Sequence, residues 1–144
     1  MTALLDVNVL VALAWPNHVH HGPALAWFER RAAEGWATCP LTQSGFVRVS
    51  SNPRVLPAAK TPEEAIRLLR RIVALPGHEF WADDVAIADG GTVDAGRIRV
   101  HSQVTDAHLL ALARRRGGRL ATFDRAVGAL LPPGIATAHL EALS

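Results

Sequence analysis

The stretch VTDAHLLALARRRGGRLATFDR, residues 104–125, constrains the fold more than any other part of the chain. Its first half predicts a helix that begins after Thr105, its N-cap, and ends before Gly117. The apolar run LLALA leaves this helix almost no polar face, so we expect it to pack deep in the molecule. Three arginines suit the negative end of the helix dipole, and the glycine pair that follows predicts the helix end.

Two carboxylates of this stretch are expected to lie at the same edge of a sheet. Asp106 falls in the first turn of the predicted helix, where the helix dipole favours a negative charge. Asp124 follows a predicted strand over residues 119–122, at its carboxyl end. Because ligands of open α/β sheets bind at the carboxyl ends of the strands, we expect both side chains to face one rim.

The rest of the chain alternates short strand patterns with helical ones. The 144 residues, 49% of them hydrophobic, are enough for one domain with a sizeable core. Strands are expected over residues 2–7, 36–39, 78–81, 119–122 and 135–138. Helices are expected between them, including a segment over residues 62–75 that begins with a capping box between Thr61 and Glu64. This alternation predicts an α/β fold over residues 1–144, a parallel β-sheet flanked by α-helices on both faces.

Asp6 is the first candidate for a functional residue. It ends the apolar run TALLDV, in which a carboxylate is costly unless it meets a cation or hydrogen-bond donors. Asn8 follows and is expected to cap the next helix. A purely structural, capped Asp6 is the less favoured interpretation.

The segment after the second expected strand supplies further candidates. Thr42 is expected to open a helix, which places Gln43 in its first turn and near the same rim. Arg48 lies on that helix. Its position is equally compatible with an ion pair and with a role in RNA binding or structure. His18, His20 and His21 are expected to lie in a solvated loop rather than to bind a metal, and Asp83 is expected to cap a helix.

Charge and composition exclude several classes of protein. The formal net charge is +2 with a pI of about 9.5, and Lys60 is the only lysine among the basic residues. A basic pI carried almost entirely by arginine is compatible with a polyanionic binding partner, and equally with an arginine-rich surface that binds no such partner. A single Cys39 excludes a disulfide framework and a Cys-rich zinc site. No apolar run is long enough to span a bilayer and no signal peptide is apparent, so we expect a cytoplasmic protein with no membrane association.

Asp6, Asp106 and Asp124 together suggest metal chemistry. Three carboxylates on one rim repel each other unless a cation lies between them. Oxygen ligands favour Mg²⁺ or Mn²⁺ over zinc, and such an ion can activate water and stabilise the charge that develops on a phosphodiester. The sequence has no Walker loop, no GxGxxG pattern and no evident Ser-His-Asp arrangement.

The segments LLDVNVLVAL, CPLTQSGFVRVSSNP, VTDAHLLALA and RLATFDRA, in this order, resemble the PIN-domain ribonucleases and in particular the VapC toxins of type II toxin–antitoxin pairs. The resemblance covers nearly the whole chain. It implies a PIN-like domain, Mg²⁺- or Mn²⁺-dependent endoribonuclease activity on structured RNA such as tRNA or rRNA, inhibition by a cognate VapB-like antitoxin, and a homodimer.

The resemblance also assigns roles to residues. Asp6, Asp106 and Asp124 match the acidic metal-site positions, and Gln43 stands where the family usually has a glutamate. An amide oxygen can still bind a metal or its water but brings no charge, which puts full two-metal occupancy in question. Asn8, Thr42, Arg48 and Thr122 are expected to support the site or to contact RNA.

Two other functions are compatible with the sequence. The start of the chain also fits an aspartyl-phosphate phosphatase with Asp6 as the nucleophile. That chemistry normally needs a second aspartate at position 8, where this chain has asparagine, and phosphoenzyme trapping would distinguish the two. The other alternative is a catalytically weakened PIN-like module that binds RNA or protein, as Gln43 suggests; the three retained aspartates argue against it.

Overall fold

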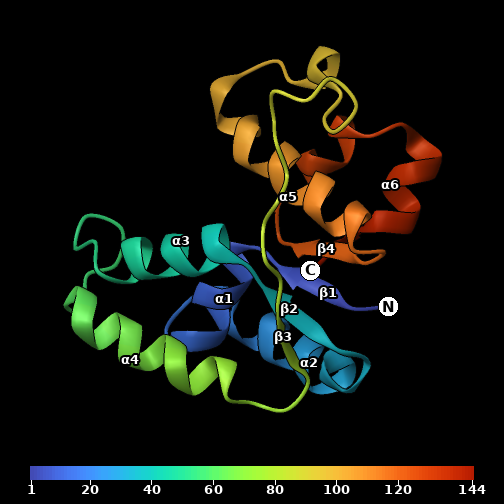
Figure 1. Cartoon of the computed structure of the whole chain (residues 1–144). Coiled ribbons are helices and arrows are strands. Elements are labelled where there is room, and N and C mark those ends of the chain that lie inside the picture. The colour runs from blue at the N-terminus through green and yellow to red at the C-terminus, as the bar shows by residue number, and fades with distance from the viewer.

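The centre of the molecule is a parallel sheet of five short strands. The computed structural model describes residues 1–144 and places the strands in the order β3-β2-β1-β4-β5, all parallel (Figure 1). The strands are β1 Ala3–Leu5, β2 Trp36–Thr38, β3 His78–Phe80, β4 Arg119–Thr122 and β5 Leu140–Ala142. Because β1 and β4 are neighbours in the middle of the sheet, the residues that follow them lie at one edge.

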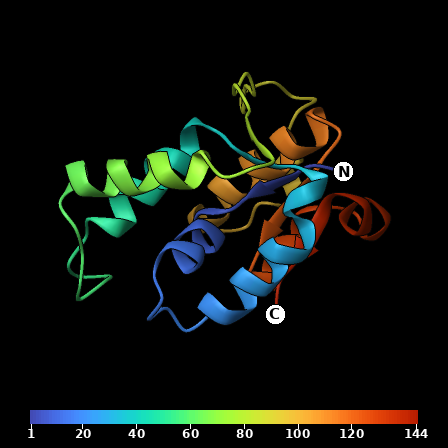
Figure 2. The same ribbon diagram turned by 90° about the horizontal axis from the view of Figure 1, so that it is seen from below.

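Helices cover both faces of this sheet, as the sequence predicts. They are α1 Val7–Ala14, α2 His21–Arg31, α3 Pro40–Ser50, α4 Pro62–Val73, α5 Val104–Arg115 and α6 Pro133–His139. Side chains of β1 alternate between two cores: Leu4 packs with the α5 residues, whereas Ala3 and Leu5 pack with α1 and Phe46 of α3. In Figure 2 the blue helices α1 and α2 lie on one side of the sheet and the orange α5 on the other.

Several predicted element boundaries are confirmed. Thr61 caps α4 by accepting the backbone N–H of Glu64, and its hydroxyl also contacts the Glu64 carboxylate. Gly117 follows α5 with a φ of 67°, the left-handed conformation that glycine adopts most readily after a helix.

Three predicted helix caps are wrong, because each helix begins earlier than its pattern indicated. Asp6 itself caps α1, accepting the N–H of Val7 at 2.7 Å, and Asn8 lies inside the helix. Proline starts α3, so Thr42 is in its first turn, where its hydroxyl accepts the N–H of Cys39 at 3.0 Å. Helix α5 continues directly from a 3-10 turn at His101–Gln103, which leaves Thr105 within the helix.

The predicted strand over residues 135–138 is also wrong. Those residues belong to α6, and the last strand is β5, which pairs with β4. The apolar run IATA is too short for its period to decide between helix and strand, and the preceding Pro132-Pro133 favours a helix start. Asp83 caps no helix either, since residues 81–86 have no regular secondary structure.

The C-terminal strand is bound by contacts that reach across the sheet. The Glu141 carboxylate accepts a hydrogen bond from Trp27 Nε1 of α2 at 2.9 Å and lies 3.5 Å from both Arg31 and Arg119. Leu143 is buried in the core beside α1 and α2. These contacts join the end of the chain to the N-terminal half of the fold.

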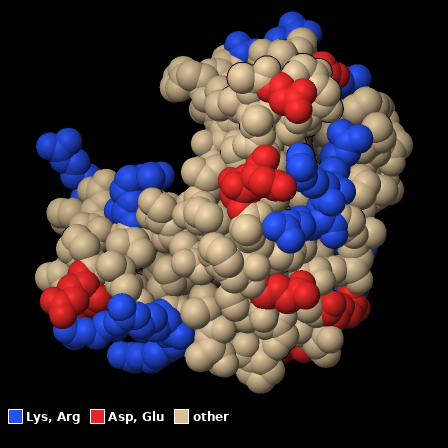
Figure 3. Space-filling model, viewed as in Figure 1, with Lys and Arg blue, Asp and Glu red and all other residues tan.

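Figure 3 shows the molecule hollowed between the lobe that carries α3 and α4 and the lobe that carries α5. No helix of the structure is both long and apolar enough to cross a membrane.

Candidate active site

The structure brings Asp6, Asp106 and Asp124 together in one cavity. Asp6 follows β1, Asp124 follows β4, and Asp106 lies in the first turn of α5. All three line a cavity of about 470 Å³, which we call the carboxylate cavity. Its other walls come from the start of α1, the end of α3 and the loops after each: Val7, Asn8, Val11, His18, Val49, Val55 and Leu56. The edge where parallel strands end is therefore where the acidic residues meet.

A hydrogen-bond network around Thr122 fixes the Asp6 carboxylate and the backbone at Asp124. The buried Thr122 hydroxyl donates to Asp6 Oδ2 at 2.7 Å. The Thr122 hydroxyl oxygen also accepts two hydrogen bonds, from the backbone N–H of Asp124 at 3.1 Å and from the Asn8 side-chain amide at 3.1 Å. Asn8 Oδ1 in turn accepts the backbone N–H of Phe123. Thr122 and Asn8 thus hold the ends of β1 and β4 in register at the site.

The three carboxylates differ in exposure and in proton affinity. Asp6 is buried, Asp106 is intermediate and Asp124 is exposed. Burial raises the pKa of Asp6, opposed by the hydrogen bonds from Thr122 and Val7. Burial, and then the charges of Asp6 and Asp124, raises the pKa of Asp106 to about 6. The site therefore stores electrostatic repulsion that a bound cation would relieve.

The raised pKa of Asp106 predicts how the stability of the metal-free protein depends on pH. Unfolded, this carboxyl has its ordinary pKa of 3.8. Between that value and about 6 the folded chain binds more protons than the unfolded chain, so stability falls as the pH rises. We expect Asp106→Asn to match the parent near pH 4 and to exceed it at pH 7 by about 1 kcal/mol, a figure reduced for solvent screening of a half-exposed group.

Urea unfolding in chelator across this pH range measures the effect. Asp84→Asn, at an exposed carboxylate outside the cavity, is the matched control and should show no such divergence from the parent. A difference between Asp106→Asn and the parent that stays constant with pH would contradict the prediction.

The donor chemistry of the cavity fits a hard divalent cation. Its charged residues are carboxylates. Beside burial, the charges of Asp6 and Asp124 raise the pKa of Asp106, and a bound cation would offset that contribution. No group of three or more His, Cys, Asp or Glu side chains is arranged to hold a metal ion as it stands. Binding would therefore have to draw the three carboxylates closer together.

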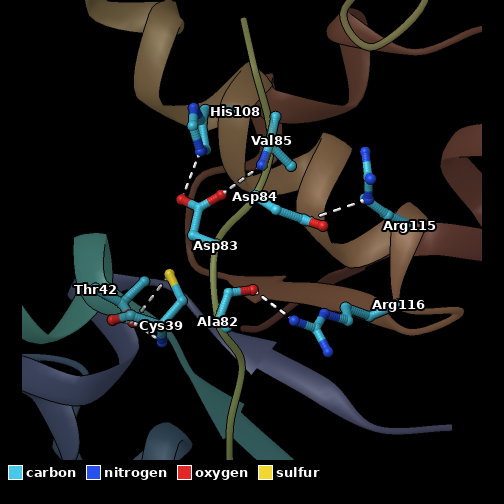
Figure 4. Close-up of polar contacts among 9 residues, drawn as sticks. All are labelled: Cys39, Thr42, Ala82, Asp83, Asp84, Val85, His108, Arg115 and Arg116. Carbon is cyan, nitrogen blue, oxygen red and sulfur yellow. Dashed lines mark hydrogen bonds and ion pairs between the residues drawn. The ribbon is translucent and has the colours of Figure 1, made fainter.

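The structure does not place Gln43, Thr42 or Arg48 among the residues that line the carboxylate cavity. The Gln43 amide donates to Thr38 Oγ1 at 2.9 Å, at the end of β2. The Thr42 hydroxyl accepts the backbone N–H of Cys39 (Figure 4). Arg48 is exposed and forms no ion pair, so the ion-pair interpretation is wrong.

The histidine-rich loop is not simply solvated, contrary to the expectation from its sequence. His18 lines the carboxylate cavity, and burial with the nearby His20 and His21 lowers its pKa. The His20 ring stacks on Phe123 at 4.5 Å, and His21 Nδ1 lies 2.8 Å from the Ala12 carbonyl oxygen. The only sequence signal was the cluster of histidines shortly after a helix that starts at Asp6.

Asp83 has a role that its sequence context did not reveal. Its carboxylate contacts His108 Nε2 at 2.6 Å and accepts the N–H of Val85, while Asp84 pairs with Arg115 at 3.2 Å (Figure 4). These contacts bind the segment after β3 to α5. Since His108 is two residues beyond Asp106, they also fix the N-terminal part of the helix that carries a site carboxylate.

The parallel sheet with carboxylates gathered at its edge is the architecture of a PIN domain. The PIN domain family model matches residues 3–129, and the chain belongs to this family.

Within the PIN-domain family, the chain is similar to several VapC ribonucleases. The chain is 54% identical to Ribonuclease VapC39 of Mycobacterium tuberculosis over 88% of this chain and 91% of that protein. It is 58% identical to Ribonuclease VapC38 of the same organism, over 87% and 86% of the two chains, and 46% identical to Ribonuclease VapC44 over 99% and 100%. The chain is thus a member of the VapC group of PIN-domain proteins.

A solved structure agrees on the fold. The crystal structure of VapBC2 from Rickettsia felis, bound to a DNA fragment from its promoter, contains a chain that matches all of this one with a TM-score of 0.66. Its sequence identity is 15%, so this likeness concerns the fold.

Proposed function

We propose that this protein is a metal-dependent endoribonuclease that acts as the toxin of a type II toxin–antitoxin pair and cleaves structured RNA, such as tRNA or rRNA, in the cytoplasm. The observation that carries the proposal is the shared cavity of Asp6, Asp106 and Asp124. The 54% identity to Ribonuclease VapC39 supports the same class of activity.

In this proposal Asp6, Asp106 and Asp124 hold Mg²⁺ or Mn²⁺. Such an ion supplies a more acidic water and stabilises the negative charge that develops on a phosphodiester. Thr122 keeps the Asp6 carboxylate oriented by donating to Oδ2, which leaves Oδ1 on the Val7 N–H at the start of α1. Asn8 holds the Thr122 hydroxyl from the opposite side, so the carboxylate is fixed before substrate arrives.

Removal of metal tests the activity directly. Purified protein is expected to cut a folded RNA in Mg²⁺ or Mn²⁺, to stop when EDTA is added, and to resume when an excess of the metal is restored. Sequencing of the RNA 5′ ends after induced expression would identify the target. Cleavage that continues undiminished in EDTA would overturn the metal-dependent mechanism.

A partner protein follows from the same proposal. A VapB-like antitoxin would cover the carboxylate cavity, where a cationic side chain could take the place of the metal. The toxin is also expected to form a homodimer. Co-expression with the adjacent small open reading frame should yield a complex and relieve growth inhibition; failure of both would count against the partnership.

The position of Gln43 leads to a quantitative prediction about metal affinity. With three carboxylates, a second divalent ion is attracted less strongly than it would be by four. Gln43→Glu adds a negative charge near the end of β2 and is expected to lower the metal concentration for half-maximal cleavage by about tenfold, equivalent to about 1.4 kcal/mol. Cleavage rate against Mg²⁺ and Mn²⁺ concentration measures it.

Ser44→Glu is the matched control, because it adds the same charge at an exposed neighbouring position. Superimposable curves for Gln43→Glu and the parent would place Gln43 outside the metal site, as a residue that only supports Thr38.

A further inference from the structure

A second cavity adjoins the carboxylate cavity. It has a volume of about 280 Å³ and is lined by Trp15, Asn17, His18, Leu56, Pro57 and Ala58; we call it the aromatic pocket. The two cavities share His18 and Leu56 in their walls, so they lie side by side. The volume is near the lower end of the range for small-molecule sites, which suits one planar group rather than a large ligand.

We propose that the aromatic pocket binds one unpaired nucleobase of an RNA strand whose neighbouring phosphodiester lies at Asp6, Asp106 and Asp124. The inference rests on the proposed ribonuclease function and adds a subsite to it. Single-stranded bases are typically bound by stacking on aromatic side chains and by hydrogen bonds to their polar edges. The pocket provides both kinds of group.

The stacking surface is fixed in place. Trp15 Nε1 donates to Ser50 Oγ at 3.2 Å, which anchors the indole ring against the end of α3. Lys60, the sole lysine, holds its ammonium nitrogen 5.8 Å from the centre of this ring. A base on the indole would therefore have a cation nearby for its own phosphate.

The polar edge of the pocket comes from Asn17 and His18. His18 Nδ1 accepts the backbone N–H of His20 at 3.0 Å, so the ring proton of the neutral imidazole is on Nε2, where it can be donated. The Asn17 amide offers a donor and an acceptor. Together they can bind the edge of a base while the phosphate chain continues into the carboxylate cavity.

The loop that carries these residues is braced directly after His18. His21 is bound to the Ala12 carbonyl oxygen, and His20 stacks on Phe123. A braced loop loses little conformational entropy when it binds, which favours a specific ligand. The charge of Lys60 also favours a phosphate-linked base over an arginine-bearing peptide segment.

Tryptophan fluorescence tests the pocket without any cleavage. Trp27, Trp36 and Trp81 are buried, so Trp15 is the one of the four tryptophans open to a ligand. In EDTA, the protein is titrated with a six-nucleotide unstructured RNA and with a base-free sugar-phosphate chain of the same charge. We expect a saturable fluorescence change with the RNA and at least a tenfold weaker affinity for the base-free chain.

Variants assign the effect to the pocket. Trp15→Phe should abolish the fluorescence change, and binding by this variant is followed with labelled RNA. His18→Ala and Asn17→Ala should each weaken RNA binding by about threefold to tenfold. Val19→Ala, in the same loop but outside both cavities, is the matched control and should bind as the parent does.

Three outcomes would overturn the inference. They are equal affinity for RNA and the base-free chain, parental RNA binding by both His18→Ala and Asn17→Ala, and tighter binding of a short arginine-containing peptide than of RNA at the same pocket. Because the titration is done in EDTA, its result does not depend on cleavage. Metal-dependent cleavage by a protein without base-dependent binding would reject the subsite while leaving the ribonuclease function intact.

Discussion

Replacing Asp6, Asp106 or Asp124 by asparagine is expected to lower the rate of RNA cleavage by about 10²–10³-fold while the fold is retained. Each change removes one negative charge from the cavity in which the three side chains meet. Asparagine keeps the shape of the side chain, and at position 6 it keeps an acceptor for the Val7 N–H that starts α1. Activity should therefore be lost without unfolding.

Single-turnover cleavage of a folded RNA measures the loss, and circular dichroism confirms the fold. Asp84→Asn is the matched control: its ion pair with Arg115 is exposed and contributes little. The control should cleave at the rate of the parent. Turnover at the parental rate by Asp124→Asn would remove that residue from the site, although the structure places it at the cavity edge.

The second large effect is expected at Thr122, the buried residue at the centre of the hydrogen-bond network. Thr122→Val keeps the volume but removes the donor to Asp6 and the acceptor for Asn8 and Asp124. The unfolding free energy should fall by about 2 kcal/mol at pH 7, because buried groups lose their partners. Cleavage should also fall, since Asp6 is no longer held in one orientation.

The loss of stability should be smaller at about pH 4. There the Asp6 carboxyl, whose pKa is already raised by burial, is more often protonated and depends less on a donor. Thr122→Ser retains the hydroxyl and should restore most of the activity. Chemical denaturation of the three proteins at both pH values measures these effects, and a Thr122→Val protein as stable as the parent would contradict the role given to the network.

The parallel architecture could be predicted from the sequence because its signals are local. The short runs ALL, followed directly by Asp6, and RLAT, followed one residue later by Asp124, mark buried strands and their carboxyl ends. Local sequence does not define the start of α1, since Asp6 and Asn8 are both good caps two residues apart. The pairing of β1 with β4 determines the start of α1. It ends at Leu5, so the Asp6 side chain can cap the helix that follows.

The parts of the site that were missed depend on contacts between distant segments. Nothing local indicates that Asp83 would meet His108, 25 residues away. His18 is likewise brought to the carboxylates by the contacts of its neighbours, His21 with Ala12 and His20 with Phe123. The meeting of Asp6 and Asp124, in contrast, follows from where strands end in a parallel sheet. Asp106 joins them from the first turn of α5.

The contacts of Glu141 determine how short a working version of this chain can be. The family match ends at residue 129, before β5 begins. A fragment cut there would expose the edge of β4 and leave Trp27 and Arg119 without their carboxylate partner. That edge would be β4 itself, which carries Thr122 and leads to Asp124, so the last residues of the chain keep this strand from pairing with another molecule.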